Sequence, residues 1–115
     1  MDAQIKKGLT DICVLAVLVR GESYGWQIIK DLEPVIEISE STLYPVLKRL
    51  QQLGQVKMRE VPYNGRLRRY FALEDLGRKR LTDFAVEQKE LFRVYNFINE
   101  ATVDEKADEK RRNEK

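Results

Sequence analysis

The dipeptide Asn64-Gly65 lies between two runs in which apolar and polar residues alternate, 56–63 and 66–73. A two-residue turn of type I′ needs positive φ at both positions, and Asn-Gly favours it more than most pairs. Taking it as the loop predicts the cross-strand pairs Tyr63–Arg66, Glu60–Arg69, Met58–Phe71 and Val56–Leu73. Because side chains alternate across a strand, the apolar members share one face, and the other face carries Lys57, Arg59, Arg68 and Tyr70. The sequence therefore predicts a β-hairpin with one apolar and one basic face.

Positive charge is concentrated around this hairpin and the stretch before it. Residues 39–73 hold seven Lys or Arg against two Glu, a net +5, which leaves −3 for the rest of a chain whose net charge is +2. A basic patch on a nearly neutral chain favours a polyanionic partner at one face. The alternative is a solvated hairpin whose charges discourage edge-to-edge aggregation.

The stretch 39–54 is typical of an amphipathic helix. Its apolar residues recur at three- and four-residue steps and share one face, namely Leu43, Val46, Leu47, Leu50 and Leu53. The outward positions are Ser41, Tyr44, Lys48, Arg49 and Gln52. Ser39 or Ser41 can cap its start, and Gly54 suits a left-handed residue at its end. Pro45 lacks an N–H, so we expect the regular helix to begin at Ser41, where only one bond is lost. The alternative is an ordinary surface helix.

A shorter helix precedes it. Ser23 is expected to cap a helix over 24–32 that ends before Pro34, with Gly25 in its first turn or at a close packing contact. Tyr24 and Trp26 are interpreted as packing residues. Two short helices joined by a turn over 34–38 form a helix-turn-helix whose second helix enters the DNA major groove.

The two ends of the chain predict association with a second copy. Residues 9–19 are apolar almost all round, so a helix there must be covered on every side. After an acidic start at Glu74-Asp75, a heptad-like stripe runs along the last helix, consisting of Leu81, Phe84, Gln88, Leu91, Tyr95, Ile98 and Thr102. Residues 103–115 have no apolar pattern and are expected to be disordered.

Composition excludes several classes of protein. Cys13 is the single cysteine, so no intramolecular disulfide can form, and a reducing cytoplasmic location is expected, with Cys13 as a small core residue. The chain has no histidine, which argues against a transition-metal site. No apolar run approaches the ~20 residues of a membrane span. No set of acids, nucleophiles or glycine-rich loops forms a catalytic constellation, so neither an enzyme nor a cofactor is predicted.

Several motifs resemble the PadR family of bacterial transcriptional regulators across roughly residues 5–100. They are Ser-Tyr-Gly at 23–25, Ser-Thr-Leu-Tyr-Pro-Val-Leu-Lys-Arg-Leu at 41–50, Gly54, Arg-Arg-Tyr-Phe-Ala-Leu at 68–73 and Gly77. The single C-terminal helix is similar to the short-tailed subfamily. The resemblance implies a homodimeric winged-helix repressor whose last helix reaches the partner's first. It also implies that an effector, phenolic or drug-like, can bind at the dimer interface. A tryptophan that stacks planar compounds in one group is replaced here by Leu91, near Phe92 and Tyr95.

These observations predict a mainly α fold with a small β-hairpin. A winged helix-turn-helix over 1–73 is followed by a dimerisation helix over 74–102 and the tail 103–115. The candidate DNA-binding residues are Ser41, Thr42, Tyr44, Lys48, Arg49, Arg66, Arg68 and Arg69. The candidate effector or dimer-interface residues are Cys13, Val17, Leu91, Phe92, Tyr95 and Ile98. A two-fold dimer predicts a pseudo-palindromic operator with half-sites about 10 base pairs apart, or a multiple of that. The alternative is a winged-helix protein-interaction module that dimerises without touching DNA.

Overall fold

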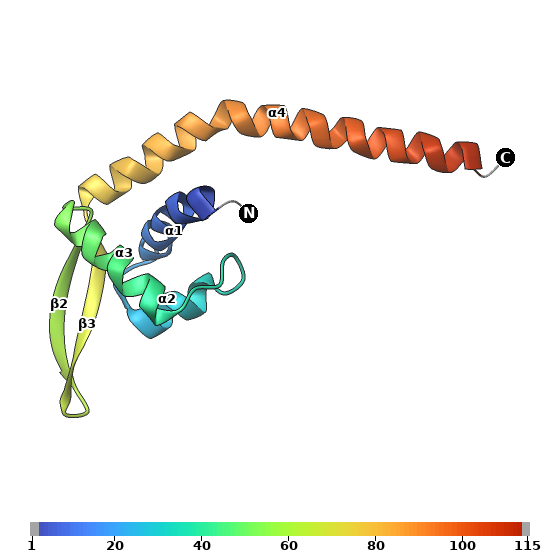
Figure 1. The fold of residues 1–115 in the computed structure, drawn as a ribbon. Coiled ribbons are helices and arrows are strands. Elements are labelled where there is room, and N and C mark those ends of the chain that lie inside the picture. Colours follow the sequence, from blue (N-terminus) through green and yellow to red (C-terminus); the bar gives the residue numbers. More distant parts are fainter. Residues whose placement is uncertain (1–2, 114–115) are drawn as a thin grey trace. The chain divides into compact units, whose positions relative to one another are not determined.

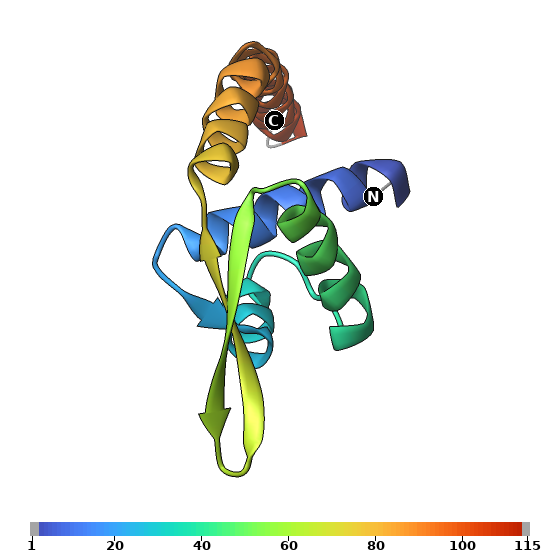
Figure 2. The same cartoon turned by 90° about the vertical axis from the view of Figure 1, so that its left-hand side faces the viewer.

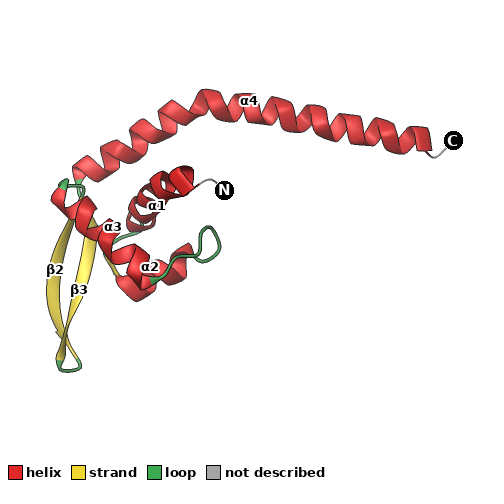
Figure 3. Cartoon of the chain, viewed as in Figure 1, coloured by secondary structure: helices red, strands yellow, loops and turns green. Residues whose placement is uncertain are grey.

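The computed structural model describes residues 3–113, with side chains described from residue 8 onward. Four helices and three strands follow one another along the chain (Figures 1 and 3). They are α1 Ala3–Leu18, β1 Ser23–Tyr24, α2 Gly25–Leu32, α3 Glu40–Gln52, β2 Val56–Tyr63, β3 Arg66–Leu73 and α4 Asp75–Asn113. The chain forms two compact units, Met1–Thr82 and Asp83–Lys115. The first unit has the winged helix-turn-helix architecture predicted from the sequence.

The core of the first unit lies where α1, α2 and α3 meet the base of the sheet. Its largest fully buried side chains are Leu15, Leu18, Ile28, Leu43, Leu47, Leu50 and Val14. The segment 9–19 is less completely covered than its composition suggests, because Ala16 in α1 and Val19 just after this helix are exposed. In α3 the predicted apolar face is buried except for Leu53, which follows the helix and is 52% exposed.

The predicted hairpin is confirmed rung by rung. Strands β2 and β3 pair from Val56↔Leu73 to Tyr63↔Arg66. At the turn, Asn64 has φ 50° and Gly65 has φ 76°, as a type I′ turn requires. The apolar face packs on the core through Val56 and Phe71, whose side chains are 2% and 4% exposed.

Strand β1 was not predicted, and it corrects the interpretation of Ser23. Residues Ser23 and Tyr24 pair with Phe71 and Tyr70, giving a three-stranded sheet in the order β1-β3-β2 (Figure 2). Ser23 is therefore a strand residue, and its Oγ is buried with no hydrogen-bond partner among the described residues. The cap of α2 is Tyr24, in extended backbone. The free edge of β3 offers ladder hydrogen bonds that two extended residues satisfy.

Helix α3 begins at Glu40, one residue before the predicted start. Pro45 then lies inside the helix at its sixth residue. The helix ends at Gln52, and Gly54 after it has φ 72°, the left-handed conformation that the sequence predicts for this residue. The Gly54 N–H donates to Gln51 O at 3.0 Å and the Gln55 N–H donates to Leu50 O at 2.9 Å. These two bonds form a Schellman motif, which fixes where the chain leaves α3.

Helix α4 corrects the prediction of a disordered tail, because the helix continues past Thr102 as far as Asn113. The tail has no apolar pattern, but opposite charges lie three apart, as in the 3.7 Å pair of Arg111 with Asp108. Basic residues in the last turn also suit the negative end of the helix dipole. Residues 114 and 115, the end of the predicted tail, lie outside the described residues. Within residues 3–113, no helix has the combined length and apolarity needed to cross a membrane.

Candidate nucleic-acid interface

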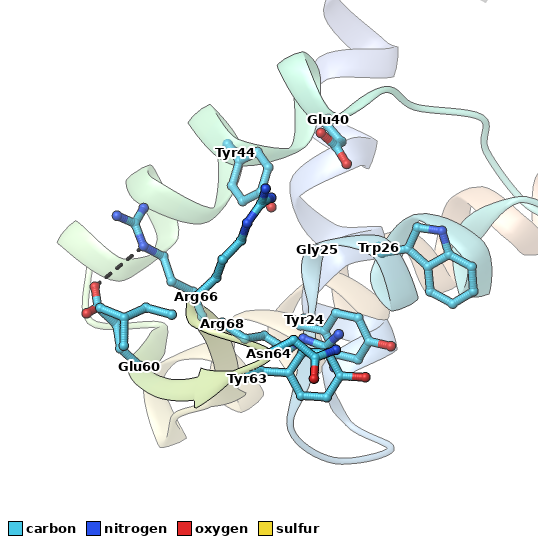
Figure 4. Close-up of a pocket in the computed structure, with 12 residues that line it drawn as sticks. Tyr24, Gly25, Trp26, Glu40, Tyr44, Glu60, Tyr63, Asn64, Arg66 and Arg68 are labelled. Atoms are coloured by element: carbon cyan, nitrogen blue, oxygen red, sulfur yellow. Dashed lines mark ion pairs between the residues drawn. The ribbon is translucent and has the colours of Figure 1, made fainter.

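An open groove of about 850 Å³ lies between helix α3, the start of α2 and the tip of the hairpin (Figure 4). Its lining combines aromatic rings with the basic residues of β3, and consists of Tyr24, Gly25, Trp26, Glu40, Tyr44, Glu60, Tyr63, Asn64, Arg66, Leu67, Arg68 and Arg69. A second hollow of about 680 Å³ lies farther along α3, where Lys48 and Gln51 face Met58 and Arg69. The surface between α3 and the hairpin is therefore concave along much of the helix.

The outer face of α3 exposes four of the predicted DNA-binding residues, Ser41, Thr42, Tyr44 and Lys48. At its start, the hydroxyl oxygens of Ser39 and Ser41 lie 2.8 Å apart, and Ser39 donates to Thr42 Oγ1 at 3.3 Å. Neither serine caps the helix by the predicted route, because Ser39 is the N-cap residue without a side-chain bond to the backbone. The hydroxyls instead form a polar cluster at the end of α3 nearest the groove.

Arg49 differs from the prediction. Its side chain turns toward α1, where its guanidinium donates from Nε to Asp11 Oδ2 at 3.2 Å and from Nη2 to Asp11 Oδ1. Asp11 is only 6% exposed. A buried carboxylate requires a cationic partner, and Arg49 provides it. The guanidinium of Arg49 is therefore paired with Asp11, while its side chain remains 39% exposed.

The three arginines of the hairpin differ in how firmly they are held. Arg69 lies 3.5 Å from Glu60 across the strands, an exposed ion pair that Figure 4 marks with a dashed line. Arg66, next to the turn, is exposed, and within residues 8–113 its side chain has neither an ion-pair partner nor a hydrogen-bond partner. Arg66 and Arg69 therefore present positive charge to the groove.

Arg68 lies between two aromatic rings. The centre of its guanidinium is 4.1 Å from the centroid of Tyr24 and 3.7 Å from that of Tyr63, and Figure 4 shows the three side chains together. Its Nη1 also donates to the Tyr70 hydroxyl at 3.5 Å, which raises the pKa of Arg68. The hairpin register alone places Arg68 on the face of Tyr70, but the role of Tyr24 required the unpredicted strand β1.

Trp26 was interpreted as a packing residue and is instead 55% exposed. It lies in the first turn of α2, lines the groove, and stacks on Tyr24 with ring centroids 6.5 Å apart. The ammonium of Lys30 lies 5.6 Å from the centroid of its ring. An exposed aromatic ring with a neighbouring cation extends the groove surface onto α2. Tyr24, by contrast, is half-buried, as a packing residue should be.

The candidate effector or dimer-interface residues fall into two groups. In the second unit, Leu91, Phe92, Tyr95 and Ile98 are all exposed, between 44% and 56%. In the first unit, Val17 belongs to the buried core of its own chain at 8% exposure, and its place at an interface stays a prediction. Cys13 is half-buried and packs against that core, and burial raises the pKa of its thiol.

Comparisons with known proteins agree on one family. The model of the transcriptional regulator PadR-like family matches residues 14–83. A PadR-like transcription factor from Bacteroides fragilis is 31% identical, with a TM-score of 0.74 over 84% of this chain and 95% of that chain. A transcriptional regulator from Clostridium thermocellum is 26% identical, with a TM-score of 0.73 over the same shares.

A third structure contains nucleic acid. It is Bacillus subtilis PadR in complex with operator DNA, which is 23% identical with a TM-score of 0.64 over 68% of this chain and 47% of that chain, and it supports the fold alone. No protein with a curated description matches the chain. The family consists of transcriptional regulators and not of enzymes. On its sequence and its fold together, this chain belongs to the PadR-like family of transcriptional regulators.

Proposed function

We propose that this regulator is a cytoplasmic, homodimeric repressor that binds a specific DNA operator through the groove between α3 and the hairpin. The observation that carries the proposal is the groove itself. On one side, the phenol of Tyr44 and the carboxylate of Glu40 line the groove, and the arginines of β3 line the other side. Ser41, Thr42 and Lys48 are exposed on the same helix, and Lys48 lines the adjoining hollow. Such a pairing matches the two kinds of contact in DNA recognition, base edges in the groove and phosphates beside it.

Each wall has its own part in this proposal. Helix α3 enters the major groove, where Ser41, Thr42, Tyr44 and Lys48 meet base edges or nearby phosphates. Arg66 and Arg69 bind phosphates from the hairpin side, because they carry the most accessible charges of the groove. Arg68 joins them through the edge of its guanidinium, since its two faces are covered by Tyr24 and Tyr63.

The proposed dimer rests on the second unit. Its helix exposes Leu91, Tyr95 and Ile98 at steps of four and three residues, so these side chains share one face. Phe97 is 72% exposed. Apolar residues repeated in this way on one helix favour pairing with a second helix. A two-fold dimer then binds a pseudo-palindromic operator, with half-sites separated by whole turns of DNA.

An effector site is proposed at the same place. Residues near a two-fold axis occur twice, so Leu91, Phe92 and Tyr95 can line an apolar site with a phenol as its polar group. Compact apolar or phenolic molecules should fit better than large flat dyes, because Leu91 offers no flat ring. Titration of such compounds should lower operator affinity, and the variant Tyr95→Phe should weaken the response. An operator affinity that no compound of a broad panel changes would contradict the effector proposal.

The rival function is protein interaction without DNA, and the charge of the groove argues against it. A surface that docks a protein has no need of three arginines along one strand facing a groove. The decisive experiment measures affinity for operator and for random DNA against salt concentration. The double variant Arg66→Ala/Arg69→Ala should flatten the log–log slope by about 1.8, since each lost phosphate contact removes about 0.9.

The control is Lys106→Ala, which removes an exposed charge of α4 outside the groove and should leave the slope unchanged. Operator DNA is first sought as an inverted repeat upstream of the coding gene. A wild-type chain that binds neither DNA, or a double variant with an unchanged slope, would overturn the proposed function.

A further inference from the structure

We propose that Asp11 is a positioning residue for operator recognition, which sets the orientation of α3 through Arg49 without touching DNA. This inference rests on the function proposed above. It concerns a cluster of four side chains within the first unit, namely Asp11 on α1, Arg49 on α3, Gln55 after α3 and Arg80 on α4, which we call the Asp11 junction.

Asp11 is held from two directions. Arg49 approaches it with two N–H groups, one to each carboxylate oxygen, so the pair has the forked geometry that fixes both distance and angle. Arg80 Nη2 lies 3.5 Å from Asp11 Oδ2. The side chain of Asp11 is 9% exposed, whereas those of Arg49 and Arg80 are 39% and 32% exposed. A single shielded carboxylate therefore ties together two cations from different helices.

Gln55 connects the junction to the ends of both helices. Its side-chain oxygen accepts from Arg80 Nη1 at 2.9 Å. Its backbone N–H completes the Schellman motif on Leu50 O, and its carbonyl accepts from the Glu74 N–H at 3.0 Å, one residue before α4. The end of α3, the start of α4 and the middle of α1 are thus joined through directional polar bonds.

These bonds constrain α3 in a way that its apolar contacts do not. The buried face of α3 consists of Leu43, Val46, Leu47 and Leu50. Apolar burial is non-directional, so these contacts hold α3 against the core but tolerate small rotations and slides. Hydrogen bonds to base edges weaken steeply when distance or angle changes. The forked bond to Asp11 selects one orientation, which is a specificity role that buried ion pairs serve in some proteins.

The test compares Asp11→Asn with Glu22→Gln. The asparagine keeps the size of the side chain and removes its charge. Glu22 forms a matched pair with Arg59, at 2.7 Å from Nε, but this pair lies beside the sheet and does not involve α3. Asp11→Asn should lower the ratio of operator to random-DNA affinity at least tenfold, while random-DNA affinity and its salt slope stay as in the wild type. Glu22→Gln should leave the ratio unchanged.

Variants of Arg49 distinguish a role in positioning α3 from a direct contact with DNA. Arg49→Gln should lower the ratio of operator to random-DNA affinity as much as Asp11→Asn does, with an unchanged salt slope. The double variant Asp11→Asn/Arg49→Gln should lower this ratio no more than either single variant. A slope that falls by about 0.9 in Arg49→Gln alone would mean a phosphate contact and would overturn the proposal. If Asp11→Asn leaves the ratio of operator to random-DNA affinity unchanged, even with a lower melting temperature, the proposal is also overturned.

Two further measurements keep the test decisive. Arg49→Lys keeps the positive charge but cannot form two hydrogen bonds to the Asp11 carboxylate, so it should lower the ratio of operator to random-DNA affinity. This variant tests the proposal even if Asp11→Asn fails to fold. If wild-type protein does not prefer its operator, the proposed function has failed. The positioning role is then read from amide hydrogen exchange, which Asp11→Asn should accelerate in α3 while Glu22→Gln does not. Equal exchange of α3 in both variants would reject the role of Asp11.

Discussion

The hydroxyl oxygen of Tyr44 lies 2.6 Å from the place that a Cβ on Gly25 would occupy. Gly25 is the first residue of α2, and Tyr44 belongs to the outer face of α3. The glycine therefore leaves room for the phenol of Tyr44 to lie across the start of α2 at the wall of the groove. A side chain at residue 25 would have to displace that phenol.

Gly25→Ala should consequently weaken operator binding more than it weakens folding. The displaced atoms are the far end of a flexible side chain, so the loss of stability should stay within about 1 kcal/mol, the scale of a Gly/Ala helix difference. Operator affinity should fall roughly tenfold, or ~1.4 kcal/mol. In a double-mutant cycle, Gly25→Ala should add little to Tyr44→Ala. Additive losses of affinity would show that the glycine acts elsewhere.

Arg68 should not tolerate lysine. Only a planar guanidinium can stack between the rings of Tyr24 and Tyr63 and still present N–H groups at its edge. We expect Arg68→Lys to lose nearly as much operator affinity as Arg68→Ala. Arg66→Lys is the matched control, because Arg66 acts as an accessible charge, and it should keep most of the affinity. Fluorescence anisotropy with labelled operator measures both, and equal tolerance at the two positions would contradict the stacked role.

The exposed apolar face of the last helix predicts a dimer that one charge can break. Leu91→Glu should weaken self-association at least tenfold, because it places a carboxylate among apolar side chains. Lys89→Glu places a carboxylate on the same helix at least about a third of a turn from each of Leu91, Tyr95 and Ile98, and it should not dissociate the dimer. Sedimentation velocity over a range of concentrations measures this. A wild-type monomer at all concentrations would exclude the proposed dimer.

Gly77 should be intolerant of any side chain. It is buried, and a Cβ there would overlap the carbonyl oxygen of Gln55 and lie 2.6 Å from Leu73 Cδ1. Backbone cannot yield as a flexible side chain does, so Gly77→Ala should destabilise the fold by about 1–3 kcal/mol. Gly8→Ala is the control, since nothing lies within 4 Å of its Cβ position, and it should be neutral or stabilising by up to about 1 kcal/mol. Urea unfolding of both variants measures the difference.

The sheet shows what sequence patterns can and cannot predict. The hairpin register followed from Asn64-Gly65. A type I′ turn fixes these two residues as the loop, and the alternation of apolar and polar side chains then agrees with one register only. Strand β1 did not follow, since two residues are too few to show alternation, and their partner strand lies more than forty residues along the chain. The position of Tyr24 beside Arg68 was hidden for the same reason, whereas Tyr63 lies on the predicted hairpin.

Charged residues of α3 were harder to place than its apolar ones. Periodicity identified the buried leucines, yet it could not tell which flanking cation borders another helix. Lys48 is exposed, whereas Arg49 turns to Asp11, because only the fold brings that buried carboxylate within reach. In the tail, the absence of an apolar pattern predicts disorder, although regularly spaced charges and the end of a long helix suffice for helical structure.

The buried apolar side chains of the hairpin lie at its base, and this separates the length of the hairpin from the packing of the core. Val56, Phe71 and Leu73 are buried, while Pro62, Tyr63, Arg66 and Leu67 near the turn are exposed. Residues could be added to or removed from both strands in twos at the tip, since each such step preserves the faces of every rung below. The length of this arm is thus free to change while the rest of the domain keeps its shape.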